Sequence, residues 1–293
     1  MARPALSASR TTAVLDLLTA FPGRAFTMSE IMRATKINVA SCHAVLNALT
    51  SHGYLARLPN EKTYVLGPAL VAVGQAALKT HPLIARAQEA AEDLFHELGA
   101  PVLLNTIVGE EILALTSIPD RAGRSPGMRL GQRAPLVPPS GAHFLAWAPE
   151  PAIEAWIAKA GPCDSEQVDS WRHALTLVRK RGFQVTLRVP QESEFAALMA
   201  EMAAGRQPLE YKEQATNLMS SQGWRLVQPE TIVVDELYDV VLIAAPIFDQ
   251  NGGSPLSLCL GGFPEKLTGA QINTYSDHLL RTCLRVMRDD RAA

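Results

Sequence analysis

Apolar residues recur with the same helical spacing at two places in the first fifty residues. Each set falls at positions i, i+3, i+4 and i+7, the spacing of one buried stripe on an amphipathic helix. The first predicted helix runs over 10–21 and is stopped by Pro22-Gly23. The second begins after Asn38, whose side chain is suited to capping a helix N-terminus. The two stripes are Val14, Leu17, Leu18 and Phe21, and Cys42, Val45, Leu46 and Leu49.

A third, shorter helix is predicted between these two. Thr27 and Glu30 have the spacing of a capping box, in which each side chain satisfies a free backbone N–H at a helix start. This helix carries Ile31 and Met32 and fades near Ala34. Two short helices joined by a tight turn are therefore expected.

Alternating residues after Gly53 predict a β-hairpin. The segments 54–58 and 63–67 have strand patterns on either side of the polar turn 59–62. Three helices followed by a hairpin are the order of elements in a winged helix-turn-helix. The same order also fits an ordinary three-helix fold whose hairpin contacts other proteins.

The rest of the chain mixes helical and strand patterns, which predicts an α+β fold with an antiparallel sheet. Gly109-Glu110 is placed as the turn between two paired strands. The predicted helices are 83–98 and 269–288, and the predicted strands are 102–108, 112–115 and 240–247.

Length and composition bound the class of protein. A chain of 293 residues is comfortable for two domains, each with its own core. Its four cysteines have no metal-ligand spacing, so we expect no disulfides and a reducing, cytoplasmic location. No apolar run reaches the roughly 20 residues of a membrane span, and the first residues lack the apolar core of a signal peptide.

The charge of the chain is divided unevenly. The net charge is −2, yet residues 1–80 carry eight Lys and Arg against three acids, a net +5 that leaves −7 for the remainder. A basic N-terminal part followed by an acidic remainder is typical of a DNA-binding module joined to another domain, because affinity for duplex DNA comes largely from phosphate neutralisation.

The motifs along the chain resemble those of the isocitrate-lyase-regulator (IclR) family of bacterial transcription factors. In the N-terminal part the matching segments are TMSEI (27–31), ASCHAVLNAL (40–49), GYLAR (53–57) and TYVLGPAL (63–70). In the C-terminal part they are VLLNTIVGEEILAL (102–115), RLGQRAPL (129–136), PSGAHFLAW (139–147) and VLIAAPIFDQNGG (241–253).

This resemblance implies a family architecture. A winged helix-turn-helix over 1–67 would be followed by a linker helix over 68–80. Residues 81–293 would form an α/β effector-binding, GAF-like domain with a central antiparallel sheet, carrying oligomer contacts. Family members act as homodimers or dimers of dimers on operator DNA.

Two departures from the family pattern concern the DNA-binding surface. Where the family commonly brings a Lys and an Arg to the DNA, this chain has Val39 and Ala44. His43 and Asn47 stay as base-edge candidates, since Asn is suited to adenine, although His43 also fits a surface histidine that contacts nothing. Ser41 is a candidate for a phosphate contact. The full set of DNA-binding candidates is Asn38, Ala40, Ser41, His43, Asn47, Arg57 and Lys62.

The implied effector site departs as well. Polar residues that line the pocket in members sensing small carboxylic acids correspond here to Leu242, Cys259 and Gly261. We therefore expect an apolar cavity and a larger, hydrophobic effector. The alternative is a cavity filled by its own side chains. The effector-site candidates are Ser140, Gly141, Phe144, Trp147, Leu242, Cys259 and Gly261.

About forty extra residues fall between Val189 and Asp239, where the family has a short connection. Helices are predicted at 192–204 and 209–221, followed by a strand at 224–227. This helical insert, at about 190–238, could cover the pocket or form an oligomer contact.

Catalytic and metal motifs do not appear in the sequence. Ser140 and His143, three residues apart on one helix, are not placed as nucleophile and base, and there is no G-x-S-x-G turn. Phosphate-loop, zinc and dinucleotide fingerprints are missing too. We expect no catalytic residue, no metal and no cofactor. The sequence thus favours a ligand-responsive transcriptional regulator, with a ligand-binding or protein-contact protein of weak DNA affinity as the alternative.

Overall fold

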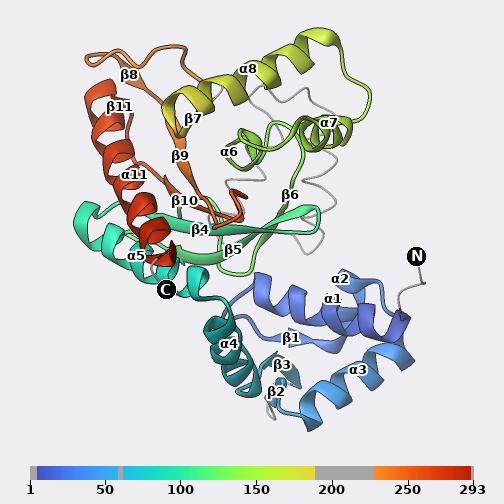
Figure 1. Cartoon of the computed structure of the whole chain (residues 1–293). Helices are drawn as coiled ribbons and strands as arrows, with labels where there is room; N and C mark the ends of the chain where they lie inside the picture. The colour runs from blue at the N-terminus through green and yellow to red at the C-terminus, as the bar shows by residue number, and fades with distance from the viewer. Residues whose placement is uncertain (1–4, 59–61, 189–227, 292–293) are drawn as a thin grey trace. The chain divides into compact units, whose positions relative to one another are not determined.

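The computed structural model describes residues 5–58, 62–188 and 228–291. The chain forms two compact units (Figure 1). The first comprises Met1–Pro82 with Leu130–Gln132, and the second comprises Leu83–Arg129 with Arg133–Ala293.

Three helices build the core of the first unit: α1 (Leu6–Ala20), α2 (Met28–Thr35) and α3 (Val39–Ser51). All three were predicted, but α1 begins four residues before the predicted start. The added residues 6–9 are exposed and do not continue the buried apolar stripe, so the apolar spacing carries no signal for them.

The predicted caps of α2 and α3 are confirmed. The Thr27 side chain accepts the backbone N–H of Glu30, while a Glu30 carboxylate oxygen accepts the backbone N–H of Thr27 at 2.8 Å. Asn38 Oδ1 accepts the backbone N–H of Ser41 at 3.0 Å. These bonds satisfy donors that a helix start leaves open, and so fix where both helices begin.

The predicted hairpin consists of β2 (Leu55–Leu58) and β3 (Thr63–Leu66). A two-residue strand that was not predicted, β1 (Phe26–Thr27), pairs antiparallel with β3 and completes a three-stranded sheet. The alternation rule could not find β1, because two residues are too few to show a period.

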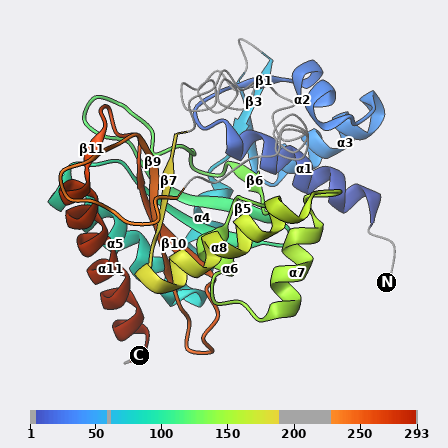
Figure 2. The same cartoon turned by 90° about the horizontal axis from the view of Figure 1, so that it is seen from above.

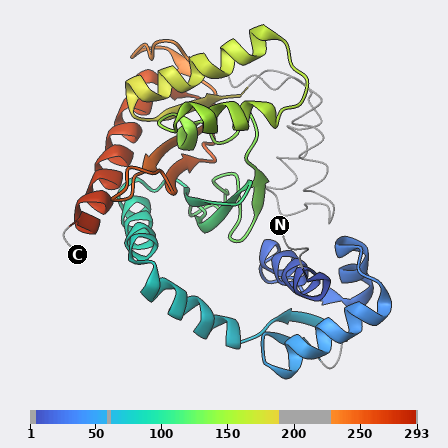
Figure 3. The same ribbon diagram turned by 45° about the vertical axis from the view of Figure 1, so that its right-hand side comes forward.

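Helix α4 (Ala69–Thr80) follows the hairpin and matches the expected linker helix. It extends away from α1–α3 of its own unit (Figure 3). None of its twelve residues, all of which are described, is buried, although Val71 and Val73 are among them. The helix therefore exposes apolar surface on the isolated chain.

The second unit is built on an antiparallel sheet with strand order β6-β5-β4-β10-β9-β7. The predicted hairpin is β4 paired with β5, and the predicted strand at 240–247 is β9. The strands are β4 (Val102–Val108), β5 (Glu111–Ile118), β6 (Arg133–Pro135), β7 (Gln184–Leu187), β9 (Val240–Ile247) and β10 (Leu256–Gly261). A separate pair is β8 (Leu237–Tyr238) with β11 (Leu267–Thr268).

Helices cover both faces of this sheet (Figures 1 and 2). On one face, α5 (Pro82–Leu98) and α11 (Gly269–Arg291) bury alanines, leucines and valines against alternate strand residues such as Leu104, Leu258 and Ile243. The opposite face meets α6 (Ala142–Leu145), α7 (Glu150–Ala158) and α8 (Ser165–Arg181), whose core is built around Trp156 and Trp171. The α+β fold with a central antiparallel sheet is thus confirmed.

The helices and strand predicted at 192–204, 209–221 and 224–227 lie outside the described residues. The described end of the insert is fixed by Tyr238, whose hydroxyl accepts the backbone N–H of Val233 at 2.9 Å. In the described part of the chain, no helix is both long enough and apolar enough to cross a bilayer.

Candidate functional site

Helix α3 buries one face and exposes the other, as its spacing predicted. Cys42, Val45, Leu46 and Leu49 are buried. The exposed face carries short or hydrogen-bonding side chains that allow close approach to a base edge. Its members are Val39, Ala40, His43, Ala44 and Asn47.

His43 and Asn47 lie one turn apart on this exposed face and contact each other. Asn47 Nδ2 and His43 Nδ1 are 3.3 Å apart. His43 is thus not a surface histidine that contacts nothing. The pair thus places two hydrogen-bonding side chains next to one another on the exposed face.

Ser41 is held from another helix. Arg10 Nη1 on α1 donates to Ser41 Oγ at 2.9 Å, and Ser41 is half-buried. The contact occupies one lone pair of the hydroxyl that we expected to meet a phosphate. It also brings a guanidinium to α3, which has no Lys or Arg of its own. Sequence spacing gave no signal for this contact, because the two residues are 31 positions apart.

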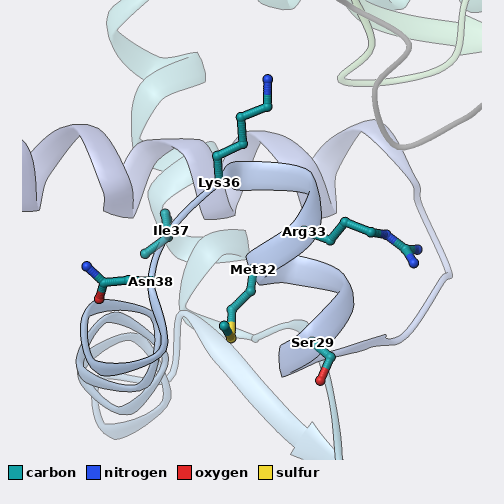
Figure 4. A pocket seen from close by; sticks show the side chains of 6 residues that line it. All are labelled: Ser29, Met32, Arg33, Lys36, Ile37 and Asn38. Atoms are coloured by element: carbon teal, nitrogen blue, oxygen red, sulfur yellow. The ribbon is translucent and has the colours of Figure 1, made fainter.

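Asn38 acts as the cap of α3, so its Oδ1 is already used by the helix. It also lines a shallow surface hollow of about 550 Å³ between α2 and the start of α3, together with Ser29, Met32, Arg33, Lys36 and Ile37. In Figure 4 the side chains of Arg33 and Lys36 point away from one another. They therefore bring positive charge to two different sides of the hollow.

The two candidates in the hairpin are both exposed. The Arg57 guanidinium carbon lies 5.9 Å from the centre of the Tyr64 ring, a cation–π contact that orients the side chain. Lys62 has a left-handed backbone with φ 51° at the start of β3. Both cations are thus on the same hairpin and available to meet a phosphate backbone.

The effector candidates divide into separate places. Leu242 and Cys259 share one face of the sheet and pack with Leu103, Ala114 and Ala244. Phe144 instead packs with the α7 and α8 core, and Trp147 stacks edge-on against Phe248 with ring centres 5.2 Å apart. The structure does not bring the two aromatic residues into the Leu242–Cys259 cluster.

The three remaining effector candidates have backbone roles. The Ser140 carbonyl accepts the indole N–H of Trp156 at 3.0 Å. Gly141 has φ +82°, which favours glycine at the start of α6. A Cβ on Gly261 would lie 2.7 Å from the carbonyl oxygen of Pro126, so glycine lets a loop lie directly against β10.

A chain of hydrogen-bonded, buried polar side chains crosses the sheet face that carries Leu242 and Cys259. His143 Nδ1 lies 3.0 Å from Gln184 Oε1, which also accepts the His143 backbone N–H, and His143 Nε2 lies 3.2 Å from Ser257 Oγ. Ser257 Oγ is 3.8 Å from Cys259 Sγ, and Asn105 Nδ2 donates to that sulfur at 3.6 Å.

Sequence reasoning missed most of this network. Its members come from α6, β4, β7 and β10, which only the fold brings together. One signal was present: Asn105 interrupts the apolar strand VLLNTIV, and a polar residue inside such a strand requires a buried partner.

Burial keeps the network uncharged. It lowers the pKa of His143 to about 4, with the Gln184 hydrogen bond opposing that shift. It raises the pKa of the Cys259 thiol to about 12. Both side chains are therefore neutral at physiological pH.

Ser257, His143 and Gln184 have the connectivity of a nucleophile, a base and an orienting group. Ser257 is fully buried, however, and an imidazole with so low a pKa is a weak base. Gln184 is a neutral amide, so its hydrogen bond offsets only part of the cost of charging this buried ring. Among the described residues, no group of three or more His, Cys, Asp or Glu side chains is placed to hold a metal ion. The triad connectivity is therefore present without an accessible nucleophile or a strong base.

Comparisons with known proteins agree with the motifs. Residues 7–59 match the model of the IclR helix-turn-helix domain. The glycerol operon regulatory protein of Streptomyces coelicolor is 28% identical over 189 residues, which is 62% of this chain and 73% of that protein.

Solved structures share the fold over nearly the whole chain. An IclR transcriptional regulator from Alicyclobacillus acidocaldarius has a TM-score of 0.69 at 18% identity, covering 98% of this chain and 100% of that one. An IclR homolog from Microbacterium hydrocarbonoxydans complexed with 4-hydroxybenzoate has a TM-score of 0.64 at 18% identity over the same shares. Residues 7–59 are thus similar in sequence to the IclR helix-turn-helix domain, and the chain shares its fold with solved IclR regulators.

Proposed function

We propose that this protein is a ligand-responsive, cytoplasmic transcriptional regulator that binds operator DNA as a dimer and senses a small, mainly apolar molecule in its C-terminal domain. The observation that carries the proposal is the exposed face of α3. It presents His43 and Asn47 among alanines on a unit with a net positive charge.

A recognition helix without cations needs them from neighbouring elements. Arg10 supplies one at the N-terminal end of α3, while Arg57 and Lys62 supply two from the hairpin. Cations on neighbouring elements and uncharged polar side chains on α3 fit DNA recognition, in which phosphate contacts position the protein and base contacts select the sequence.

Helix α4 supports a homodimer or a dimer of dimers. Val71 is 67% exposed and Val73 is 49% exposed, and the two lie on different sides of a helix that is apolar over most of its length. Exposed apolar surface of this kind favours a partner that covers it. A two-fold dimer would present two α3 helices to half-sites about one helical turn apart. Effector binding would then change DNA affinity by shifting the two domains through α4.

The cluster around Leu242 and Cys259 supports an apolar effector. The apolar side chains packed around these two residues are Leu103, Ala114, Met128, Ala134 and Ala244. The relative complexed with 4-hydroxybenzoate supports a small-molecule role for the domain. We expect Leu242→Ser to weaken binding of a hydrophobic effector, because it adds an unpaired hydroxyl to this cluster.

The direct test is fluorescence anisotropy of the full chain with duplex DNA from upstream of its own gene. Asn47→Ala removes a base-reading amide, and loss of one good bidentate contact reduces specific affinity by about 1–3 kcal/mol, roughly 5- to 150-fold. Ser51→Ala on the same helix is the matched control, since the Ser51 hydroxyl bonds only to the Ala48 carbonyl of α3. Equal loss in both variants, or no sequence preference in the wild type, would refute the assignment of α3.

The alternative, a ligand-binding or protein-contact protein with weak DNA affinity, is favoured by the lack of Lys and Arg on α3. Salt dependence separates the two. With six or more phosphate contacts, raising the salt concentration from 50 to 200 mM should reduce DNA affinity about a thousandfold. With few contacts, the slope of log K against log salt should be shallow.

A further inference from the structure

We propose that the polar chain on the sheet face of the second unit selects a neutral ligand that donates a hydrogen bond, such as an alcohol or phenol on an apolar body, and excludes carboxylates. The inference rests on the ligand-sensing function proposed above and names the chemical class that this site takes. Its basis is a hydrogen-bond acceptor that the network leaves without a donor.

The donors around His143 are all used within the protein. Gln184 Oε1 can only accept, and it receives both the backbone N–H and the Nδ1–H of His143. His143 Nε2 is therefore the acceptor of the neutral ring, so the Ser257 hydroxyl gives its proton to it at 3.2 Å. The remaining amide of Gln184 donates to Thr186 Oγ1 at 2.9 Å.

The same assignment of donors and acceptors extends from Ser257 to Asn105, where one acceptor has no donor. Because the proton of Ser257 is committed to His143, Ser257 Oγ receives the S–H of Cys259. The sulfur is then free to accept the Nδ2–H of Asn105. Asn105 Oδ1 has no hydrogen-bond partner among the described residues, although the side chain is only 4% exposed.

An orphaned buried acceptor has a chemical preference. Leaving one unpaired costs about 1–3 kcal/mol, which a ligand hydroxyl would recover by donating to it. A carboxylate or an ether brings only acceptors and would face Asn105 Oδ1 without a proton between them.

The lack of charged side chains in the network favours the same class of ligand. The network joins the side chains of Asn105, His143, Gln184, Thr186, Ser257 and Cys259, and none of them is a Lys, Arg, Asp or Glu. A buried carboxylate would have no cation opposite it, and an ammonium would have no anion. A neutral ligand avoids both penalties.

The surroundings of the acceptor suit an apolar body. Asn105 pairs in register with Ala114, and Cys259 pairs with Ala244, so this part of the sheet carries short side chains. Met128, from the loop that packs on this cluster, faces them. Methionine has three rotatable side-chain bonds and adapts to an inserted ring more readily than a branched residue.

The test uses three probes with one shared body: 4-methylphenol, 4-methylanisole and 4-methylbenzoate. Each is titrated into the full-length wild-type protein by isothermal calorimetry. We expect 4-methylphenol to bind about tenfold more tightly than its methyl ether, the equivalent of one hydrogen bond of about 1.4 kcal/mol, and 4-methylbenzoate to bind most weakly.

Two variants locate the effect. Asn105→Leu should reduce the phenol-to-ether ratio to about one. Thr106→Val, the next residue on β4, should keep the tenfold ratio, because its hydroxyl bonds the Pro255 carbonyl and not the network. Tighter binding of the ether or the benzoate, an unchanged ratio in Asn105→Leu, or no binding of any probe at millimolar concentration would overturn the proposal. Anisotropy with operator DNA on the same preparations tests the regulator function separately.

Discussion

His143 illustrates how much of a residue's role depends on long-range neighbours. In the sequence it stands three positions from Ser140, and that spacing only argued against catalysis. In the structure its ring is held by Gln184 and Ser257, residues 41 and 114 positions away. The apolar character of the strands was predictable from their composition, but these partners depend on the register of β7 and β10 and on the position of α6.

The buried ring makes stability depend on pH. The pKa of His143 is lowered to about 4 in the folded protein, against 6.5 unfolded, so the unfolded state binds a proton first as the pH falls. The contribution of the neutral His143 ring to the free energy of unfolding is fully present above pH 6.5. It is lost between pH 6.5 and 4, at about 1.4 kcal/mol per pH unit.

Urea unfolding at pH 7.5, 5.5 and 4.5 measures this dependence. We expect His143→Gln to flatten the profile relative to wild type over that window. His96→Gln, which changes an exposed histidine on α5, is the control and should keep the wild-type profile. An identical pH profile for His143→Gln would show that the ring is not the group responsible.

Gly261, a predicted effector-site residue, lies against two other backbone segments. A Cβ at this position would lie 2.7 Å from the Pro126 carbonyl oxygen and 3.1 Å from that of Val241, both backbone atoms. We expect Gly261→Ala to lower the free energy of unfolding by about 1–3 kcal/mol. Gly74→Ala, in open space on α4, should instead raise it by up to about 1 kcal/mol. Chemical denaturation of both variants checks the contrast.

At the scale of elements, local signals were sufficient for the helices of the first unit. The capping box of Thr27 and Glu30 and the Asn38 cap depend on residues three positions apart, so the sequence alone placed them. Strand β1 and the Arg10–Ser41 contact depend on chain segments that meet only after folding. Spacing rules do not detect such pairs.

The Arg10–Ser41 contact leads to a prediction about DNA binding. Arg10 brings positive charge to an uncharged α3, so Arg10→Ala should remove about one phosphate contact. The slope of log K against log salt should then become shallower by about 0.9. Ser41→Ala breaks the same hydrogen bond but keeps the guanidinium, and it should leave the slope unchanged. Anisotropy titrations at four salt concentrations measure both slopes, and equal slopes for Arg10→Ala and wild type would contradict the phosphate contact.

At the scale of the whole molecule, composition predicted the division of the chain. The basic first eighty residues fall within the first unit, which also contains Leu130–Gln132, and most of the acidic remainder lies in the second. Composition does not reveal how apolar residues are distributed between core and surface. Helix α4 is as rich in Ala, Val and Leu as a core helix, yet the folded chain leaves it exposed.

That exposure yields a prediction about assembly. Val71 is 67% exposed, so Val71→Glu should change the stability of a monomer by no more than about 0.5 kcal/mol. If α4 forms the seam of a dimer, the same change places two carboxylates in an apolar contact and should shift the protein toward monomer. Binding to an operator with two half-sites should weaken sharply, while binding to a single half-site should change little.

Sedimentation equilibrium and anisotropy on both DNA lengths measure these effects. Thr80→Glu, at the exposed end of the same helix, adds an equal charge away from the apolar stretch and serves as the control. A Val71→Glu protein with wild-type mass and wild-type affinity for the full operator would exclude α4 from the interface. A monomeric Val71→Glu that keeps half-site affinity would assign assembly to α4 and would separate it from DNA reading, because only assembly would then have been lost.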